Sequence, residues 1–290
     1  MMSDEIGETK LSDSVRGVLH YSRFSGGKGD VPFVGVNDPT RNSADFAADP
    51  REVAIVDARR FRNELSVDVE GVELVDHRSC VSEFNNRDDY QRYLREVENV
   101  IRRYTGAHRV IASAQVAVRT SDRAAIAEGG VAPGSLVHSD YNLASLRDFW
   151  LPEVNIDLDS DEFRDYDHFR VYQTWRVLSD PPVRNNLAFC DVRTMSATDA
   201  VKVNYVVTKP DPETGGSHDQ YAENYLFKHN PDHRWLYFSN LNSDEMAVWL
   251  GYDGRNQEVR VAHCAFRDRS VPESAPPRTS IETRMVAFFK

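Results

Sequence analysis

The C-terminal stretch EVRVAHCAFRDRSVPESAPPRTSIETRMVAFF, residues 258–289, holds two strand-like segments joined by a turn-rich connection. In the first segment apolar and polar residues alternate up to Phe266, and the second runs from Arg278 to Phe289. Short alternating runs of β-branched and aromatic residues, bounded by Pro, Ser and Asp, are typical of strands. This stretch therefore predicts a β-rich C-terminal region.

The same pattern extends back to residue 109. Short β-branched or aromatic runs separated by turn residues include RVIASAQVAVRT (109–120), FRVYQTWRVL (169–178), VKVNYVVT (201–208) and EMAVWLGYD (245–253). Many short strands of this kind predict an all-β sandwich or barrel. We expect residues 1–14 to form a flexible tail and residues 15–290 a single domain. Within that domain, 15–108 would form an N-terminal α/β scaffold and 109–290 the β core.

One clear helix is predicted before the β region, over residues 88–106. Its apolar residues recur at steps of three and four, giving one stripe made of Tyr90, Tyr93, Leu94, Val97, Val100, Ile101 and Tyr104. Asp88 or a neighbouring asparagine can cap its start, and Gly106 can end it. Such a stripe favours a scaffold helix that packs against a sheet.

Composition narrows the class of partner. Acidic residues outnumber basic ones by 46 to 35, for a net charge of −11, which disfavours nucleic acid as the main partner. No run approaches 18 apolar residues, so we expect no membrane partner. The polar N-terminus lacks the apolar region of a signal peptide, so we expect a cytoplasmic protein. A small-molecule partner fits best, and homo-oligomerisation stays open. The three cysteines are far apart and predict no zinc knuckle.

The segment LVHSDYN, residues 136–142, contains a candidate metal-binding pair. In a strand, residues i and i+2 face the same side, so His138 and Asp140 can bind one ion. A short motif of this kind is weak evidence by itself. The facial triad of mononuclear iron oxygenases needs one more histidine on a neighbouring strand and leaves coordination positions open.

His263 is the best candidate for the third ligand. Most other histidines lie before the motif or in polar, turn-like segments, whereas His263 follows it in an alternating strand. His233, which adjoins the apolar run RWLYF, is the next candidate. Fifteen residues after His263, Arg278 and Ser280 share a strand face. A guanidinium and a hydroxyl could together bind the far carboxylate of an α-keto acid.

These motifs resemble the iron(II)- and 2-oxoglutarate-dependent oxygenases. More narrowly, four stretches resemble a hydroxylase/desaturase family that includes the hydroxylase component of cephamycin biosynthesis and fungal enzymes of secondary metabolism. They are HSDYN (138–142), PVRNNLAFCD (182–191), ENYLFKHNPDHRWLYFSNLNSDE (223–245) and VAHCAFRDRSVPESAPPRTSIETRMVAFF (261–289). The second stretch departs from the family by its shorter length and by Asn186 in place of proline.

The resemblance implies a mainly β fold and a set of site residues. The fold would be a double-stranded β-helix, a jelly-roll or cupin-like barrel, with flanking α-helices, in a single oxygenase domain. Iron(II) would be held by His138, Asp140 and His263. Arg278 with Ser280 would anchor 2-oxoglutarate, and Arg284 is the alternative anchor. The alternative for whichever arginine is not the anchor is a salt bridge, for which Glu282 is the candidate partner.

Five further residues are candidates for the substrate pocket: Tyr141, Tyr225, His233, Trp235 and Tyr237. Core packing is the alternative for the aromatic residues, and a structural role is the alternative for His233.

The implied activity is oxidation of a small molecule, expected to be a secondary metabolite, by hydroxylation, desaturation or ring formation. Its cofactors would be iron(II), 2-oxoglutarate and dioxygen. One alternative is an iron oxidase or oxygenase of the same fold that uses dioxygen without 2-oxoglutarate. Another is a non-catalytic metal-binding barrel. A hydrolase is disfavoured because the chain lacks a G-x-S-x-G motif.

Overall fold

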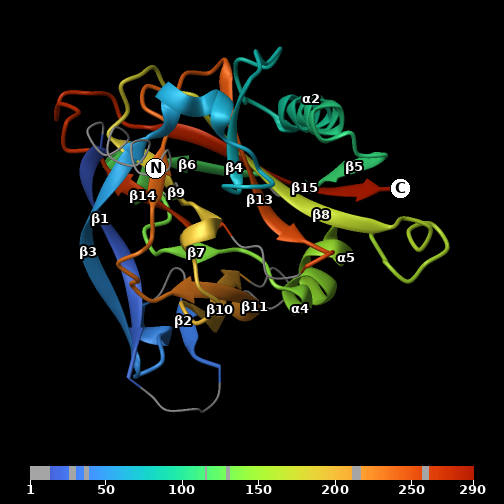
Figure 1. The fold of residues 1–290 in the computed structure, drawn as a ribbon, viewed down its shortest axis with the longest axis horizontal. Helices are drawn as coiled ribbons and strands as arrows, with labels where there is room; N and C mark the ends of the chain where they lie inside the picture. Colours follow the sequence, from blue (N-terminus) through green and yellow to red (C-terminus); the bar gives the residue numbers. More distant parts are fainter. Residues whose placement is uncertain are drawn as a thin grey trace, which may run out of the picture.

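Two curved β-sheets form the centre of the computed structural model (Figure 1). The structure describes residues 14–25, 31–35, 39–114, 116–128, 131–210, 217–256 and 261–290. Most of the predicted N-terminal tail lies outside the described residues. No helix in the described part of the chain is long and apolar enough to cross a membrane.

The larger sheet has nine strands. In spatial order they are β1 (Ser14–Phe24), β3 (Phe46–Asp57), β12 (Trp235–Tyr237), β9 (Asn185–Cys190), β14 (His263–Arg267), β7 (His138–Ser139), β11 (Ser217–Phe227), β10 (Ala200–Pro210) and β2 (Phe33–Gly35). All pairs are antiparallel except β12 with β3 and β10 with β2. Strands far apart in sequence, such as β7 and β14, are neighbours in this sheet.

The second sheet has six strands. Its order is β4 (Val72–Asp76), β13 (Glu245–Asp253), β8 (His168–Val177), β15 (Thr279–Phe289) and β5 (Arg109–Ala112), and β6 (Ala117–Thr120) also pairs with β15. Two curved, mainly antiparallel sheets of this kind are the arrangement of a jelly-roll. Of the strands that precede residue 109, β1, β2 and β3 belong to the nine-stranded sheet and β4 belongs to the six-stranded sheet. The predicted division at residue 109 stays a prediction.

The helical segments are short apart from one. They are α2 (Arg87–Thr105), α3 (Arg123–Ala127), α4 (Leu143–Ser145), a π-helical turn (Leu146–Trp150), α5 (Leu151–Glu153) and the 3-10 turns Pro39–Arg41, Ala58–Glu64 and Val192–Thr194. The predicted helix is confirmed as α2, which begins after the capping residue Asn86 and ends at Gly106 in a left-handed conformation. Figure 1 shows α2 outside the six-stranded sheet.

The antiparallel pair of β1 and β3 forms one edge of the nine-stranded sheet, and β1 also approaches β14. At Gly17 on β1, an added Cβ would lie 2.7 Å from Cδ1 of Ile55 and 2.8 Å from the Phe266 ring on β14. Only glycine therefore lets β1 approach β14 this closely.

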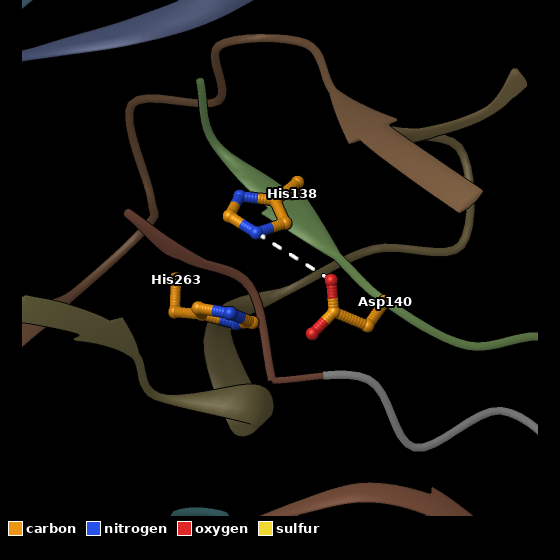
Figure 2. A group of neighbouring side chains, drawn as sticks. All are labelled: His138, Asp140 and His263. Carbon is orange, nitrogen blue, oxygen red and sulfur yellow. Dashed lines mark ion pairs between the residues drawn. The ribbon is translucent and has the colours of Figure 1, made fainter. Parts of the chain in front are cut away.

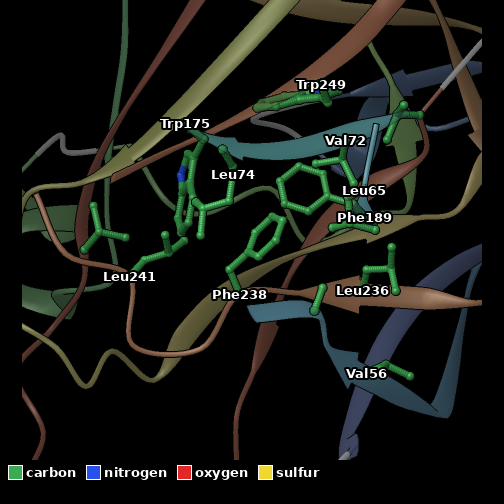
Figure 3. Packing of buried hydrophobic residues seen from close by; sticks show 14 of the residues in the cluster. Val56, Leu65, Val72, Leu74, Trp175, Phe189, Leu236, Phe238, Leu241 and Trp249 are labelled. Carbon is green, nitrogen blue, oxygen red and sulfur yellow. The ribbon is translucent and has the colours of Figure 1, made fainter. Parts of the chain in front are cut away.

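The main core fills the space between the two sheets (Figure 3). Val72, Trp175 and Trp249 come from the six-stranded sheet, and Phe189 and Leu236 come from the nine-stranded sheet. Phe189 is the register partner of His263, so this core lies directly beside one of the predicted metal ligands.

Candidate metal centre

The structure brings His138, Asp140 and His263 together (Figure 2). One ligand atom from each lies within 4.8 Å of the others. His138 and His263 are register partners on β7 and β14, and their ring centroids are 4.4 Å apart. The proximity predicted from the sequence is confirmed, and it depends on the pairing of two short strands that are distant along the chain.

Backbone hydrogen bonds orient both imidazoles. Nδ1 of His138 lies 2.7 Å from the carbonyl oxygen of Leu136, and Nδ1 of His263 lies 3.0 Å from that of Val261. A carbonyl only accepts, so each Nδ1 carries the proton and donates it. The Nε2 lone pairs are then available to a metal ion, as is usual for histidine ligands with such a partner.

The charge state of the cluster also suits a cation. Burial, followed by the proximity of His138, lowers the pKa of His263 to about 4, so its ring is neutral at pH 7. Burial alone would raise the pKa of Asp140, but the nearby Arg284 and the two histidines outweigh it and hold the pKa well below its usual range. Two imidazoles and one carboxylate are the donor set of a facial iron triad.

Aromatic and apolar side chains bound the triad on one side. The Trp249 ring centroid lies 5.1 Å from that of His263 and 5.3 Å from that of Phe189. Both aromatic residues are fully buried. This wall keeps water from that side of His263.

Arg278 is buried without a carboxylate partner. It is 1% exposed, Nη1 donates to the carbonyl of Asn185 at 2.8 Å, and the guanidinium lies 5.3 Å from the Trp175 ring centroid. Burial, with Arg119 second, lowers its pKa to about 9, so it stays charged at pH 7. Within the described part of the chain, Nε of Arg278 and Oγ of Ser280 are buried without hydrogen-bond partners.

Arg284 has the opposite surroundings. Its Nη2 lies 2.7 Å from Oε1 of Glu282 and 3.2 Å from Oδ2 of Asp140. These two carboxylates raise its pKa above the ordinary value although burial lowers it. The salt bridge with Glu282, expected for the arginine that is not the anchor, is thus made by Arg284.

Four of the predicted pocket residues contact a hydrophobic cluster on the other side of the sheet from the triad, and their contact with a substrate stays a prediction. Tyr225, Trp235 and Tyr237 pack in a cluster with Val137 and Cys264. Those two neighbours of the ligands point to the opposite face of the sheet because side chains alternate along a strand. Core packing, the alternative for these aromatic residues, is what the structure shows.

His233 has a structural position in the same region. Its Nε2 lies 3.0 Å from Oδ2 of Asp199, and its Nδ1 lies 3.1 Å from the hydroxyl of Tyr21. Trp235 Nε1 donates to the same hydroxyl at 2.8 Å. Both ring nitrogens of His233 are engaged, so it does not replace His263 as a ligand.

Tyr141 is the predicted pocket residue that does lie beside the centre. It follows Asp140 directly, is 1% exposed and packs against Trp150 at 5.6 Å between ring centroids. An added Cβ at Gly251 would lie 2.8 Å from the Tyr141 ring, so the ring fills the space that this glycine leaves.

Replacing Tyr21 with phenylalanine should lower the free energy of unfolding by about 2 kcal/mol, because it leaves Trp235 Nε1 and His233 Nδ1 buried without their partner. Urea unfolding measures the change. The matched control is Tyr221→Phe, since Tyr221 is exposed. Equal stability of the two variants would show that the buried hydroxyl contributes nothing.

A family model described as "Oxidoreductase/YMDC permease-like domain" matches residues 19–288. The chain belongs to this family. The hydroxylase/desaturase efuI of Hormonema carpetanum is 27% identical to it over 295 residues, which cover 96% of each chain. The Fe(II)/2-oxoglutarate-dependent dioxygenase nvfI of Aspergillus novofumigatus is 27% identical over 263 residues, covering 86% of this chain and 87% of that protein.

The fold of this family member matches a solved structure. The iron and alpha-ketoglutarate-dependent endoperoxidase NvfI superposes with a TM-score of 0.80 at 24% identity, covering 95% of this chain and 98% of that one. The predicted jelly-roll fold is thereby confirmed, and the relatives confirm the predicted resemblance to iron(II)/2-oxoglutarate oxygenases.

One residue at the centre, Gln173, escaped the sequence analysis. Its Nε2 donates to Oδ2 of Asp140 at 2.6 Å. The sequence feature that could have indicated Gln173 is an amide side chain in the middle of FRVYQTWRVL. This run is buried from Arg170 to Val177. A polar residue inside such a strand needs a partner, but the run itself does not say which one.

Proposed function

We propose that this protein is an iron(II)- and 2-oxoglutarate-dependent oxygenase that hydroxylates, desaturates or cyclises a small molecule. His138 and His263 would hold the iron through Nε2, and Asp140 through its carboxylate. A donor set of two imidazoles and one carboxylate fits iron(II) and leaves positions for other ligands. The similarity to curated oxygenases supports the same assignment.

The single observation that supports 2-oxoglutarate as the co-substrate is the charge of Arg278, which has no carboxylate partner among the described residues. A buried cation without an anion is costly, so an anionic ligand is expected beside it. Ser280, Glu282 and Arg284 occupy every second position of β15, so their side chains lie on the same face of the strand. Arg284 contacts Asp140, so this face is directed toward the triad. The far carboxylate of 2-oxoglutarate fits Arg278 and Ser280.

Bound iron(II) and 2-oxoglutarate together supply the activation of dioxygen for attack on an unreactive C–H bond. The chain orients and shields this chemistry. Backbone carbonyls keep both imidazoles in the ligating tautomer, and Arg278 would fix the co-substrate at its far end. The buried wall of Trp249 and Phe189 excludes water from the site.

The substrate would be a secondary metabolite, because the sequence resembles fungal enzymes of secondary metabolism. The names of the relatives include hydroxylase/desaturase and endoperoxidase, so one fold serves several outcomes. A cytoplasmic location, homo-oligomerisation and the lack of nucleic-acid or membrane partners stay predictions from the sequence.

Anaerobic addition of iron(II) and then 2-oxoglutarate tests the proposal. We expect a weak visible charge-transfer band that appears only when both are present. Absence of the band would contradict the proposal. Full turnover without 2-oxoglutarate would instead favour the oxidase of the same fold that needs no co-substrate.

A further inference from the structure

The two oxygens of the Asp140 carboxylate have different surroundings. Oδ1 lies 3.6 Å from Nε2 of His138. Oδ2 accepts hydrogen bonds from Nε2 of Gln173 at 2.6 Å and from Nη2 of Arg284 at 3.2 Å. The two donors therefore engage one oxygen and leave the other toward a metal ion.

A second buried carboxylate is held by the same two donors. Oε1 of Glu282 lies 3.2 Å from Nε2 of Gln173 and 2.7 Å from Nη2 of Arg284. Glu282 is therefore a neighbour of the metal ligands. The compact ligand cluster nevertheless contains only His138, Asp140 and His263 among the described residues.

The strand register fixes the two donors in place. Gln173 on β8 is the register partner of Arg284 on β15. An added Cβ at Gly251 would lie only 2.7 Å from Oε1 of Gln173, so the amide is packed closely on that side. The Arg284 guanidinium lies 5.2 Å from the Trp150 ring centroid, and its side chain is 11% exposed.

We propose that Gln173 and Arg284 are positioning residues that hold Asp140 for coordination through one oxygen and keep Glu282 away from the metal. Partners behind a ligand orient it and tune its affinity. A second oxygen of Asp140, or Glu282 itself, would fill a position that must stay open for the co-substrate and dioxygen. This inference rests on the proposed function. It makes Arg284 a residue that orients the metal ligand Asp140, and not the anchor of 2-oxoglutarate.

Cobalt(II), followed by its visible absorption, is the probe for this role. Gln173→Met and Arg284→Lys each disturb a hydrogen bond to Oδ2 without changing the net charge. We expect each to weaken cobalt(II) binding by about 10- to 100-fold and to change the spectrum of the bound ion. A residue with a merely structural role would lower stability but leave the spectrum of the bound ion unchanged.

Arg278→Lys is the matched control, because Arg278 is also a buried arginine but makes no hydrogen bond to Asp140 in the described part of the chain. Its cobalt(II) affinity should stay within about twofold of wild type, since no partner of a metal ligand is lost. Thermal unfolding without metal establishes that each variant is folded. If Arg284→Lys does not fold, Gln173→Met decides the question.

Wild-type affinity and spectrum in the folded variants would overturn the inference. So would an Arg284→Lys variant with unchanged cobalt(II) binding and weakened 2-oxoglutarate binding. Failure of the wild-type protein to bind cobalt(II) would instead contradict the proposed function, so the two failures are distinguishable.

Discussion

Replacing His263 with alanine is expected to abolish stoichiometric metal binding and to lower turnover by at least about 1000-fold, the equivalent of ~4 kcal/mol. His263 supplies one of only three protein ligands in the cluster, and its ring is held with Nε2 available. Two remaining ligands cannot hold iron(II) in a defined geometry. Anaerobic titration with iron(II) or cobalt(II), followed by calorimetry, measures the loss.

His108→Ala is the control for this substitution. His108 is exposed and lies outside the cluster, so its removal should leave metal affinity unchanged. A His263→Ala variant that binds the metal as tightly as wild type would show that the cluster is not the metal site.

Replacing Arg278 with lysine should raise the concentration of 2-oxoglutarate required for binding while metal binding survives. Lysine keeps the charge but loses the planar fork that binds a carboxylate through two hydrogen bonds. Loss of such a buried partner costs about 2–5 kcal/mol, or at least about 30-fold in affinity. Titration of 2-oxoglutarate into the cobalt(II)-loaded protein measures the shift.

Arg284→Lys is the comparison that separates the two arginines. It should change 2-oxoglutarate affinity much less than Arg278→Lys, because Arg284 already pairs with Glu282 and Asp140. The two variants should therefore show opposite patterns. Arg278→Lys weakens 2-oxoglutarate binding, whereas Arg284→Lys weakens metal binding. Equal effects on 2-oxoglutarate would indicate a shared clamp, and an unaffected Arg278→Lys would place the anchor elsewhere.

Local features were predictable from the sequence. The helix expected at 88–106 is found at Arg87–Thr105, and the last strand, expected at 278–289, is found at Thr279–Phe289. Helical periodicity, capping and strand alternation act over a few residues, so they can be read in short windows. The spacing of His138 and Asp140 is also a local feature that can be read from a few neighbouring residues.

The different surroundings of Arg278 and Arg284 were not predictable from alternation, which places both on one face of the strand. The pairing of β15 with β8 brings Arg284 opposite Gln173, and both then meet Asp140. Arg278 lies beside Trp175 and forms no ion pair with a carboxylate of the described residues. Charge pairing depends on neighbours from other strands, which a single strand does not specify.

The sequence by itself determined the β-rich class, the amphipathic helix, and the ordered set of His138, Asp140 and His263 as ligand candidates. The tertiary structure decided that Tyr225, Trp235 and Tyr237 pack behind the sheet and that Arg284 and Gln173 hold Asp140. The physical reason is the distance along the chain over which each interaction acts. Periodicity specifies which side chains share a face, whereas the partner across a sheet is set by contacts between segments far apart in the chain.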